Sequence, residues 1–336
     1  MTTTRAELTP LTDAQWEQRV RARLMVCVPD LLPGTPTVRR ITGLADDVWL
    51  VDLADGGRLV AKHQFYGIYT RDEPHDLLRV EFDALRHLRQ HGGAVPVAFG
   101  IDPEMQIILL EYAGRLTLAE QIPSVDPSTR RRLGARVLAG LFRIESLLAA
   151  PELEWGARVI PGADPGDLMT RWAEIGEIAV DGLSRLWRAR RRDEMTAGLA
   201  TQLKHLCRRL GERPPSLGAT DYQPANIVVD EPCERITFLE LAKVGWDWTE
   251  RRAVQYTTSV DGSGTSLLDG GGVAASPLAS DAVDGHHILF LLLLARRFLT
   301  TSHGDMSGLV QALVTPLSRD PRALEIRRGL QPLNFA

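Results

Sequence analysis

The pattern of hydrophobic and polar positions changes near residue 112, so the sequence predicts two parts of different structure. Before that point, short runs rich in branched and aromatic residues predict strands, and after it longer runs with helical spacing predominate. The strands are expected at about 38–41, 47–53, 58–62, 95–99 and 106–111, with helices at 12–27 and 78–91. The later helices are expected at 127–149, 165–190, 194–210, 281–302 and 305–317, with one strand pair at 226–229 and 236–240.

This order of elements predicts an α+β chain with two lobes. Residues 1–111 would form a small lobe of sheet plus one helix, preceded by the helix at 12–27, which Pro29 is expected to end. Residues 112–336 would form a larger, mainly helical lobe, with a cleft between the two. The glycine-rich stretch 261–272 is expected to be a mobile loop.

Overall composition excludes several classes of protein. The chain is 44% hydrophobic and 24% charged, with a formal net charge of −4, so it gives no reason to expect nucleic acid or a membrane surface as partner. The longest apolar run, at 288–295, is too short to span a bilayer. Three widely separated cysteines, and an N-terminus without the apolar core of a signal peptide, predict a cytoplasmic protein.

Two rare residue types point to specific chemistry. The chain contains 36 arginines but only three lysines, and one of them, Lys62, ends the predicted strand at 58–62. Asparagine occurs only twice, and Asn226 lies five residues after Asp221. A compact ammonium and a neutral side-chain oxygen are both needed where a protein holds a nucleoside triphosphate with Mg²⁺.

The first candidate group lies in the predicted sheet lobe. Lys62 would contact the nucleotide phosphates, and Glu81, at the start of the next helix, would pair with it. Alternatively, Lys62 is an exposed strand residue and Glu81 a surface residue in a first helical turn. Glu111, Tyr112 and Ala113 follow the last strand of the lobe, where backbone groups of a connector can bind an adenine edge. A plain strand end and turn would have the same sequence.

The second candidate group lies in the predicted helical lobe. Asp221 would accept or orient the proton of an acceptor hydroxyl, and Asn226 would give its side-chain oxygen to Mg²⁺. Glu240, at the end of the second strand of a hairpin, could reach the same metal. Asp247 is a weaker candidate for that place. The alternative is a polar loop, because Asp, Pro and Asn are common in turns.

Taken together, these motifs resemble the aminoglycoside phosphotransferase and choline kinase family, a branch of the protein-kinase-like fold. Val60-Ala-Lys62 resembles its phosphate-binding strand, and Leu109-Leu-Glu-Tyr112 its hinge. Residues 221–226 resemble the catalytic loop, usually H-G-D-x-x-P-x-N, and residues 236–245 the metal-binding segment, usually I-D-F-E-x-A-x-x-G. The resemblance implies a small antiparallel-sheet lobe that binds nucleotide, a helical catalytic lobe, ATP or GTP with Mg²⁺, and a hydroxyl acceptor.

The chain also departs from the family pattern. Ala219-Thr220 stands where the family has His-Gly, Glu240 replaces the metal-binding Asp, and the segment 43–47, expected to cover the phosphates, is poor in glycine. Three functions therefore stay open. The first is an ATP/Mg²⁺-dependent O-phosphotransferase for a small molecule or natural product. The second is a Ser/Thr kinase of a ribosomally made peptide that works with a partner lyase. The third is a pseudokinase that binds or scaffolds without turnover.

Two further motifs are not needed for this site. The basic run at 185–192 is expected to be a solvated helix end, with a dock for an acidic partner as the alternative. His286 and His287 lack companions at zinc-ligand spacing and are expected to be structural.

Overall fold

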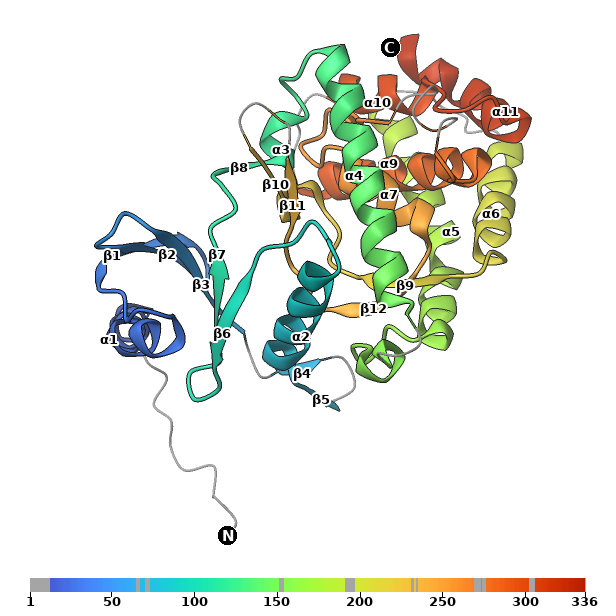
Figure 1. Cartoon of the computed structure of the whole chain (residues 1–336). Helices are drawn as coiled ribbons and strands as arrows, with labels where there is room; N and C mark the ends of the chain where they lie inside the picture. The colour runs from blue at the N-terminus through green and yellow to red at the C-terminus, as the bar shows by residue number, and fades with distance from the viewer. Residues whose placement is uncertain are drawn as a thin grey trace.

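The structure is a computed structural model with a small sheet-containing part and a larger helical part (Figure 1). It describes residues 13–64, 67–69, 73–150, 154–190, 197–230, 233, 235–268, 273, 276–301 and 306–335. Residues 269–272, within the predicted loop, and residues 191–192 of the basic run lie outside the described residues.

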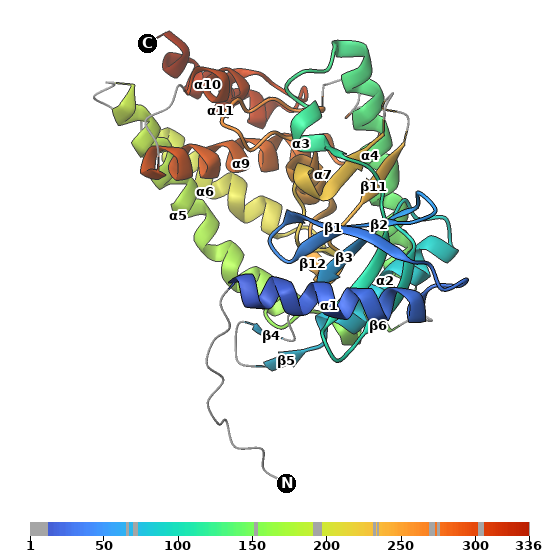
Figure 2. The ribbon, with the colours of Figure 1, turned by 90° about the vertical axis from the view of Figure 1, so that its left-hand side faces the viewer.

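The part before residue 112 is built on a five-stranded antiparallel sheet. Its elements are α1 (Asp13–Leu31), β1 (Val38–Ala45), β2 (Val48–Leu53), β3 (Arg58–His63), β4 (Gly67–Tyr69), β5 (Glu73–His75), α2 (Leu77–Gln90), β6 (Ala98–Asp102) and β7 (Ile107–Glu111). The strand order in the main sheet is β1-β2-β3-β7-β6, and β4 pairs separately with β5. Helix α1 covers one face of the main sheet, and α2 lies on the other side, toward the helical part (Figures 1 and 2).

Strand alternation divides the hydrophobic side chains between the two faces of this sheet. On β7, Ile107 and Leu109 pack in the cluster under α1, whereas Ile108 and Leu110 belong to the large core shared with α2 and the helical part. Because successive side chains point to opposite faces, the same rule places Lys62, opposite Ile108 on β3, on the inner face.

Helix α1 is longer than the sequence predicts. It continues through Pro29 to Leu31, although a proline there removes one backbone hydrogen bond and crowds the carbonyl four residues earlier. The buried side chains Val20, Leu24 and Val28 hold this last turn against the sheet, so packing outweighs the local preference of proline. The expected end at residue 27 was therefore wrong by one turn.

The part after residue 112 is mainly helical, with short strands near the sheet. Its elements are β8 (Leu116–Thr117), α3 (Leu118–Gln121), α4 (Pro127–Leu148), η2 (Trp155–Arg158), α5 (Pro165–Ala189), α6 (Ala197–Gly211), β9 (Ser216–Ala219), η3 (Pro224–Asn226), β10 (Ile227–Val229), β11 (Ile236–Phe238), β12 (Val244–Asp247), α7 (Thr249–Thr257), α9 (Ser280–Thr301), α10 (Ser307–Val314), α11 (Pro321–Leu330) and η4 (Gln331–Phe335). The pairs β10–β11 and β9–β12 are antiparallel, and β8 pairs with β10. The sequence predicted the first of these pairs but missed β9–β12 and the helices α7 and α11.

Helices α5 and α9 cross at very short distance. A Cβ atom at Gly182 would lie 2.3 Å from the carbonyl oxygen of Leu292, so only glycine permits this approach. The crossing fixes the relative positions of two helices that line a cavity described below. No helix among the described residues is long and apolar enough to cross a membrane.

A buried aromatic cluster joins α5, α9 and the start of α7. The ring centroid of Trp172 lies 4.5 Å from that of Trp248 and 5.4 Å from that of His286. Burial, with the positive charge of Arg251 nearby, lowers the pKa of His286 to about 3. Its Nε2 atom has no hydrogen-bond partner in the described part of the chain, so a proton on this ring would be unstabilised.

We expect His286 to make the protein acid-sensitive. Above pH 6.5 the folded and unfolded forms both carry a neutral ring, whereas below it the unfolded chain binds a proton that the folded form excludes until about pH 3. The free energy of unfolding should therefore fall by up to about 1.4 kcal/mol per pH unit from this group as the pH drops below 6.5. Urea titrations from pH 7 to pH 4.5 should show a shallower slope for His286→Leu, while exposed His205→Leu should keep the wild-type slope. An equally steep slope in both variants would contradict this assignment.

Candidate active site

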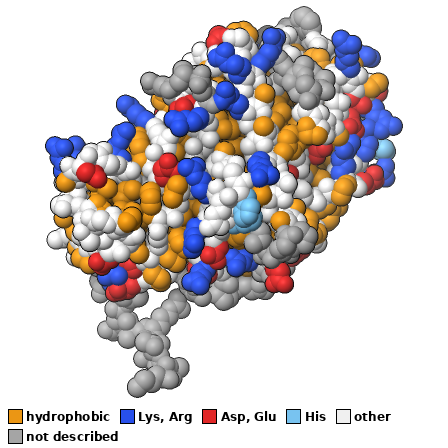
Figure 3. All heavy atoms as spheres, viewed as in Figure 1, with side chains coloured by type: hydrophobic (Ala, Val, Ile, Leu, Met, Phe, Trp, Pro, Cys, Tyr) orange, Lys and Arg blue, Asp and Glu red, His pale blue; other side chains and the backbone are white. Residues whose placement is uncertain are grey.

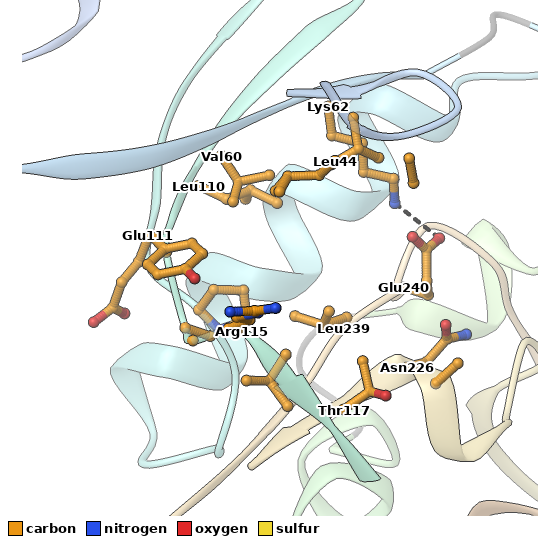
Figure 4. A pocket seen from close by; sticks show the side chains of 18 of the residues that line it. Leu44, Val60, Lys62, Leu110, Glu111, Arg115, Thr117, Asn226, Leu239 and Glu240 are labelled. Atoms are coloured by element: carbon orange, nitrogen blue, oxygen red, sulfur yellow. Dashed lines mark ion pairs between the residues drawn. The ribbon is translucent and has the colours of Figure 1, made fainter. Parts of the chain in front are cut away.

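A cavity of about 340 Å³ lies between the sheet and the helical part. Figure 4 shows its two ends. Apolar side chains, including Val60, Leu110 and Leu239, line one region, and Lys62 and Glu240 meet at the other. Such a cavity suits a ligand with one flat apolar end and one strongly charged end.

Lys62 lies at the charged end and contacts two carboxylates. Its Nζ atom is 3.0 and 3.2 Å from the two oxygens of Glu81 and 2.8 Å from Oε2 of Glu240. Burial alone would lower the pKa of Lys62, but the two carboxylates raise it above its ordinary value, so the side chain is an ammonium ion. The structure thus brings together the predicted pair Lys62–Glu81 and adds Glu240 to it.

Glu81 is held in place from two sides. It lies in α2, whose first turn is capped by the side chain of Asp76, and only 1% of its surface is exposed. Gln64, directly after β3, donates a hydrogen bond to Glu81. The alternative of a surface glutamate is excluded by this burial. Gln64 was missed, because a lone glutamine after a strand carries no signal in the sequence.

The connector after β7 borders the apolar end. Glu111, Tyr112 and Ala113 all line the cavity, and their role as a hinge for a nucleotide stays a prediction. The Glu111 carboxylate accepts a hydrogen bond from the backbone of Val97, and the guanidinium of Arg58 lies 4.4 Å from the centre of the Tyr112 ring. These contacts fix the connector and leave its backbone beside the cavity.

The loop 221–226 contributes residues to this cavity and to a second one. Asn226 lines the first cavity, and its Nδ2 donates to the backbone carbonyl of Asp221 at 2.8 Å. Its side-chain oxygen therefore faces the region where Glu240 lies (Figure 4). Asp221 itself lines a different cavity of about 400 Å³ on the helical side. The structure does not place Asp221 in the wall of the first cavity with Asn226, although one loop carries both.

Lys243 is a second lysine at this site. Its Nζ lies 3.0 Å from Oδ2 of Asp221, and the backbone of Thr220 donates to its carbonyl oxygen at 2.9 Å. The sequence reasoning missed this residue. The same scarcity of lysine that pointed to Lys62 would have identified it.

Glu240 has an unusual backbone conformation. Its φ angle is +59°, in the left-handed region that costs a non-glycine residue roughly 1–2 kcal/mol. It follows β11, where the backbone N–H of Leu239 donates to the carbonyl of Asn226 at 2.8 Å. This conformation turns the Glu240 side chain toward Lys62, two positions beyond the end of the strand.

Arg252 supports the loop from beneath. It is fully buried on α7 and donates to the backbone carbonyls of Ala219, Ser216 and Gly245 at 2.8, 3.0 and 3.0 Å. Its Nη1 lies 2.7 Å from Glu145 of α4. The guanidinium therefore ties β9, which leads into Asp221, to β12, which follows Lys243.

The remaining candidates have other surroundings. Asp247 is buried against Arg251, at 2.9 Å, and accepts a hydrogen bond from Tyr222. Burial would raise the pKa of Asp247, but Arg251 and Arg252 hold it below its ordinary value. It lines the second cavity, so it does not replace Glu240 beside Lys62.

In the basic run at 185–192, Arg185 pairs with Asp181 at 2.9 Å. In the described part of the chain, no group of three His, Cys, Asp or Glu side chains is arranged as a metal site.

A small antiparallel sheet with a buried Lys–Glu pair, a connector beside a cleft, and a helical part with a polar loop define a kinase-like phosphotransferase. A model of the phosphotransferase enzyme family matches residues 37–248, and the chain belongs to that family. This membership confirms the predicted family and enzyme class. No curated protein matches the chain by sequence.

Solved structures share the fold at low sequence identity. An aminoglycoside phosphotransferase from Alicyclobacillus acidocaldarius is 12% identical, with 88% of this chain and 91% of that chain covered and a TM-score of 0.50. Choline kinase LicA from Streptococcus pneumoniae is also 12% identical, with 94% and 99% covered and a TM-score of 0.47. A choline/ethanolamine kinase family protein from Mesorhizobium loti is 16% identical, with 95% and 99% covered and a TM-score of 0.47. The first of these supports the α+β, kinase-like fold that the sequence predicted.

Proposed function

We propose that the protein transfers the terminal phosphoryl group of ATP to a hydroxyl group of a small molecule or natural product. The observation that carries this proposal is the position of Lys62. A buried ammonium, fixed by Glu81 and Glu240, closes one end of a cavity whose other end is apolar. A nucleoside triphosphate has the matching distribution of a flat base and a chain of negative charge.

The nucleotide would lie along the first cavity. Its base would pack between Val60, Leu110 and Leu239, with its edge toward the backbone of Glu111–Ala113. Its phosphates would extend to Lys62, which neutralises part of their charge. Residues 1–111 would then act as the nucleotide-binding lobe and residues 112–336 as the catalytic and substrate lobe.

The oxygen donors near Lys62 fit Mg²⁺. Asn226 offers a neutral amide oxygen and Glu240 a carboxylate on the same cavity, and Mg²⁺ is commonly held by one or two carboxylates plus substrate phosphates. When bound there, the ion would neutralise charge on the phosphates. Glu240 would exchange its contact with Lys62 for this role.

Asp221 would act as the base for the acceptor hydroxyl. Its carboxylate lines the second cavity, and its Oδ1 lies 3.4 Å from Nδ2 of Asn226, which lines the first. A hydroxyl held at this boundary could donate its proton to Asp221 while its oxygen attacks the terminal phosphorus of ATP, with ADP as the leaving group. Lys243, 3.0 Å from Asp221, would orient the carboxylate and add positive charge beside the transferred group. The chain's residues would thus act mainly by positioning and by charge neutralisation.

Nucleotide binding tests this proposal directly. We expect Lys62→Met to weaken ATP binding in the presence of Mg²⁺ by about 10- to 150-fold, because hydrogen bonds to charged groups contribute about 1.5–3 kcal/mol. Isothermal titration calorimetry should measure this loss, and methionine retains the apolar stem of the side chain. Lys204→Met is the matched control, since Lys204 is exposed on α6 and pairs only with Glu177 among the contacts described for it.

The other outcomes of this titration are equally informative. Unchanged ATP affinity in Lys62→Met would remove the nucleotide from this cavity and overturn the proposal. Tight ATP binding without transfer to any hydroxyl compound would favour the pseudokinase instead. A Glu240→Ala variant that loses the Mg²⁺ dependence of binding would support the assigned metal position.

A further inference from the structure

The cavity beside Asp221 differs in charge from the molecule as a whole. The chain has a formal net charge of −4, and basic and acidic side chains are interspersed on the face shown in Figure 3. The second cavity, by contrast, is lined by three arginines, Arg171, Arg251 and Arg297, and two aspartates. Its local charge is therefore the more specific guide to what it binds.

The two aspartates are already paired with cations. Asp247 binds Arg251 at 2.9 Å, and Asp221 binds Lys243 at 3.0 Å. Arg251 is also fixed between aromatic rings, 5.4 Å from the centre of Trp172 and 5.9 Å from that of Tyr222. These four charges neutralise one another within the wall.

Arg171 and Arg297 differ from these four charged residues in having no described partner. Each lines the cavity from a separate helix, α5 and α9, and neither guanidinium has a hydrogen bond or ion pair with another described residue. Arg296, the residue before Arg297 on α9, differs from it in this respect, because its guanidinium binds Asp181 at 2.7 Å. Both exposed guanidinium groups therefore line the cavity that contains Asp221, with donors that no other described residue occupies.

The wall of this cavity is partly apolar. Phe290 and Leu294 precede Arg297 at i, i+4 and i+7 on one face of α9, and Val260 adds a third apolar side chain. An occupant would therefore contact both hydrocarbon and guanidinium groups. Arginine binds carboxylate and phosphate through paired N–H groups, whereas it repels a cationic occupant.

We propose that the acceptor is a small molecule that carries an oxyanion and an apolar body in addition to the hydroxyl group. This inference rests on the proposed function, since it names the substrate class for Asp221. The hydroxyl would face Asp221, the apolar body would lie on Phe290 and Leu294, and the oxyanion would bind Arg171 or Arg297. A polycationic acceptor is disfavoured by the same two charges.

Three probes of one size test this assignment without catalysis. They are 4-(hydroxymethyl)benzoate, its neutral amide and 4-(hydroxymethyl)benzylamine, which share a ring and a hydroxyl group and differ in charge. In nucleotide-free calorimetric titrations we expect the carboxylate to bind with millimolar affinity, as suits so small a ligand, and the amine not to bind. The double variant Arg171→Gln/Arg297→Gln should bind the carboxylate at least about tenfold more weakly, since it loses charge-assisted hydrogen bonds.

Matched variants make the result specific. Arg296→Gln, the adjacent arginine turned to Asp181, should bind the carboxylate like wild type, and so should Lys62→Met. Melting temperatures check that the double variant is folded. Each of the following would overturn the inference: equal binding of amide or amine, no binding of any probe, carboxylate binding that survives in the double variant, or loss of that binding in Lys62→Met. Because ATP binding is measured separately, failure here is distinguishable from failure of the proposed function.

Discussion

Replacing Asp221 by asparagine is expected to slow phosphoryl transfer by about 10²- to 10⁴-fold, the usual contribution of a positioned acid or base. Asparagine has the same size and keeps an oxygen near Lys243, but it cannot take the proton of a hydroxyl. ATP should still bind, because Asp221 lies in the wall of the second cavity and not of the first. Single-turnover transfer of labelled phosphate to an acceptor found by screening hydroxyl-bearing anions would measure the rate, and calorimetry would measure the ATP affinity.

The control for this substitution is Asp281→Asn. Asp281 also pairs with a basic side chain, Arg213 at 2.8 Å, but lines neither cavity, so the variant should transfer phosphate at the wild-type rate. A transfer rate in Asp221→Asn that equals wild type would exclude Asp221 as the base. A loss of ATP affinity equal to the loss of rate would instead show that the loop 221–226 had moved as a whole.

Replacing Arg252 by alanine should lower the free energy of unfolding by about 3–5 kcal/mol, the cost of removing one partner of a buried ion pair. The change would leave the carboxylate of Glu145 without its buried cation and remove donors from the carbonyls of Ala219, Ser216 and Gly245. Urea denaturation followed by circular dichroism would measure the effect. Arg252→Lys should lose less stability, since it keeps the charge but not the planar set of donors.

An exposed arginine gives the reference for this measurement. Arg322 lies on the surface of α11, and Arg322→Ala should change the free energy of unfolding by no more than about 0.5 kcal/mol. If Arg252→Ala were as mild, the buried contacts of Arg252 would be of no consequence for stability. The assignment of Arg252 as the link between β9 and β12 would then be wrong.

Much of the fold follows from local patterns in the sequence. Helices α4 and α5 begin where an N-cap aspartate precedes a proline, at Asp126-Pro127 and Asp164-Pro165, and the apolar spacing after each predicts the rest. Asp320-Pro321 carries the same signal for α11, which the sequence analysis missed. Strand β9 could not be found in this way. Ser216–Ala219 is short and contains small residues, and it is held by pairing with β12 and by Arg252, over long sequence separations.

The residues of the candidate site likewise divide into those that the sequence identifies and those that only the structure reveals. Lys62, Asp221 and Asn226 stand out because each has a rare residue type or lies in a recognisable loop next to a strand. Their side-chain environments remain structural information: the contact of Lys62 with Glu240, and of Asp221 with Lys243, depends on folding segments that lie far apart. The assigned roles of these residues are still predictions. Arg171 and Arg297 have no local signal, since 36 arginines occur in the chain and only the packing of α5 on α9 brings these two to one cavity.

The two cavities differ in which parts of the chain form them. The first takes its wall from both the sheet and the helical part, so any tilt of the sheet changes its width. All the described residues that line the second lie between 171 and 297, within the helical part, so none of them belongs to the sheet. Neither ligand therefore has to create the other's binding site. For the proposed ligands we therefore expect a sequential mechanism in which either one binds first. Double-reciprocal lines should intersect, and a dead-end analogue of each substrate should be competitive with that substrate and noncompetitive with the other.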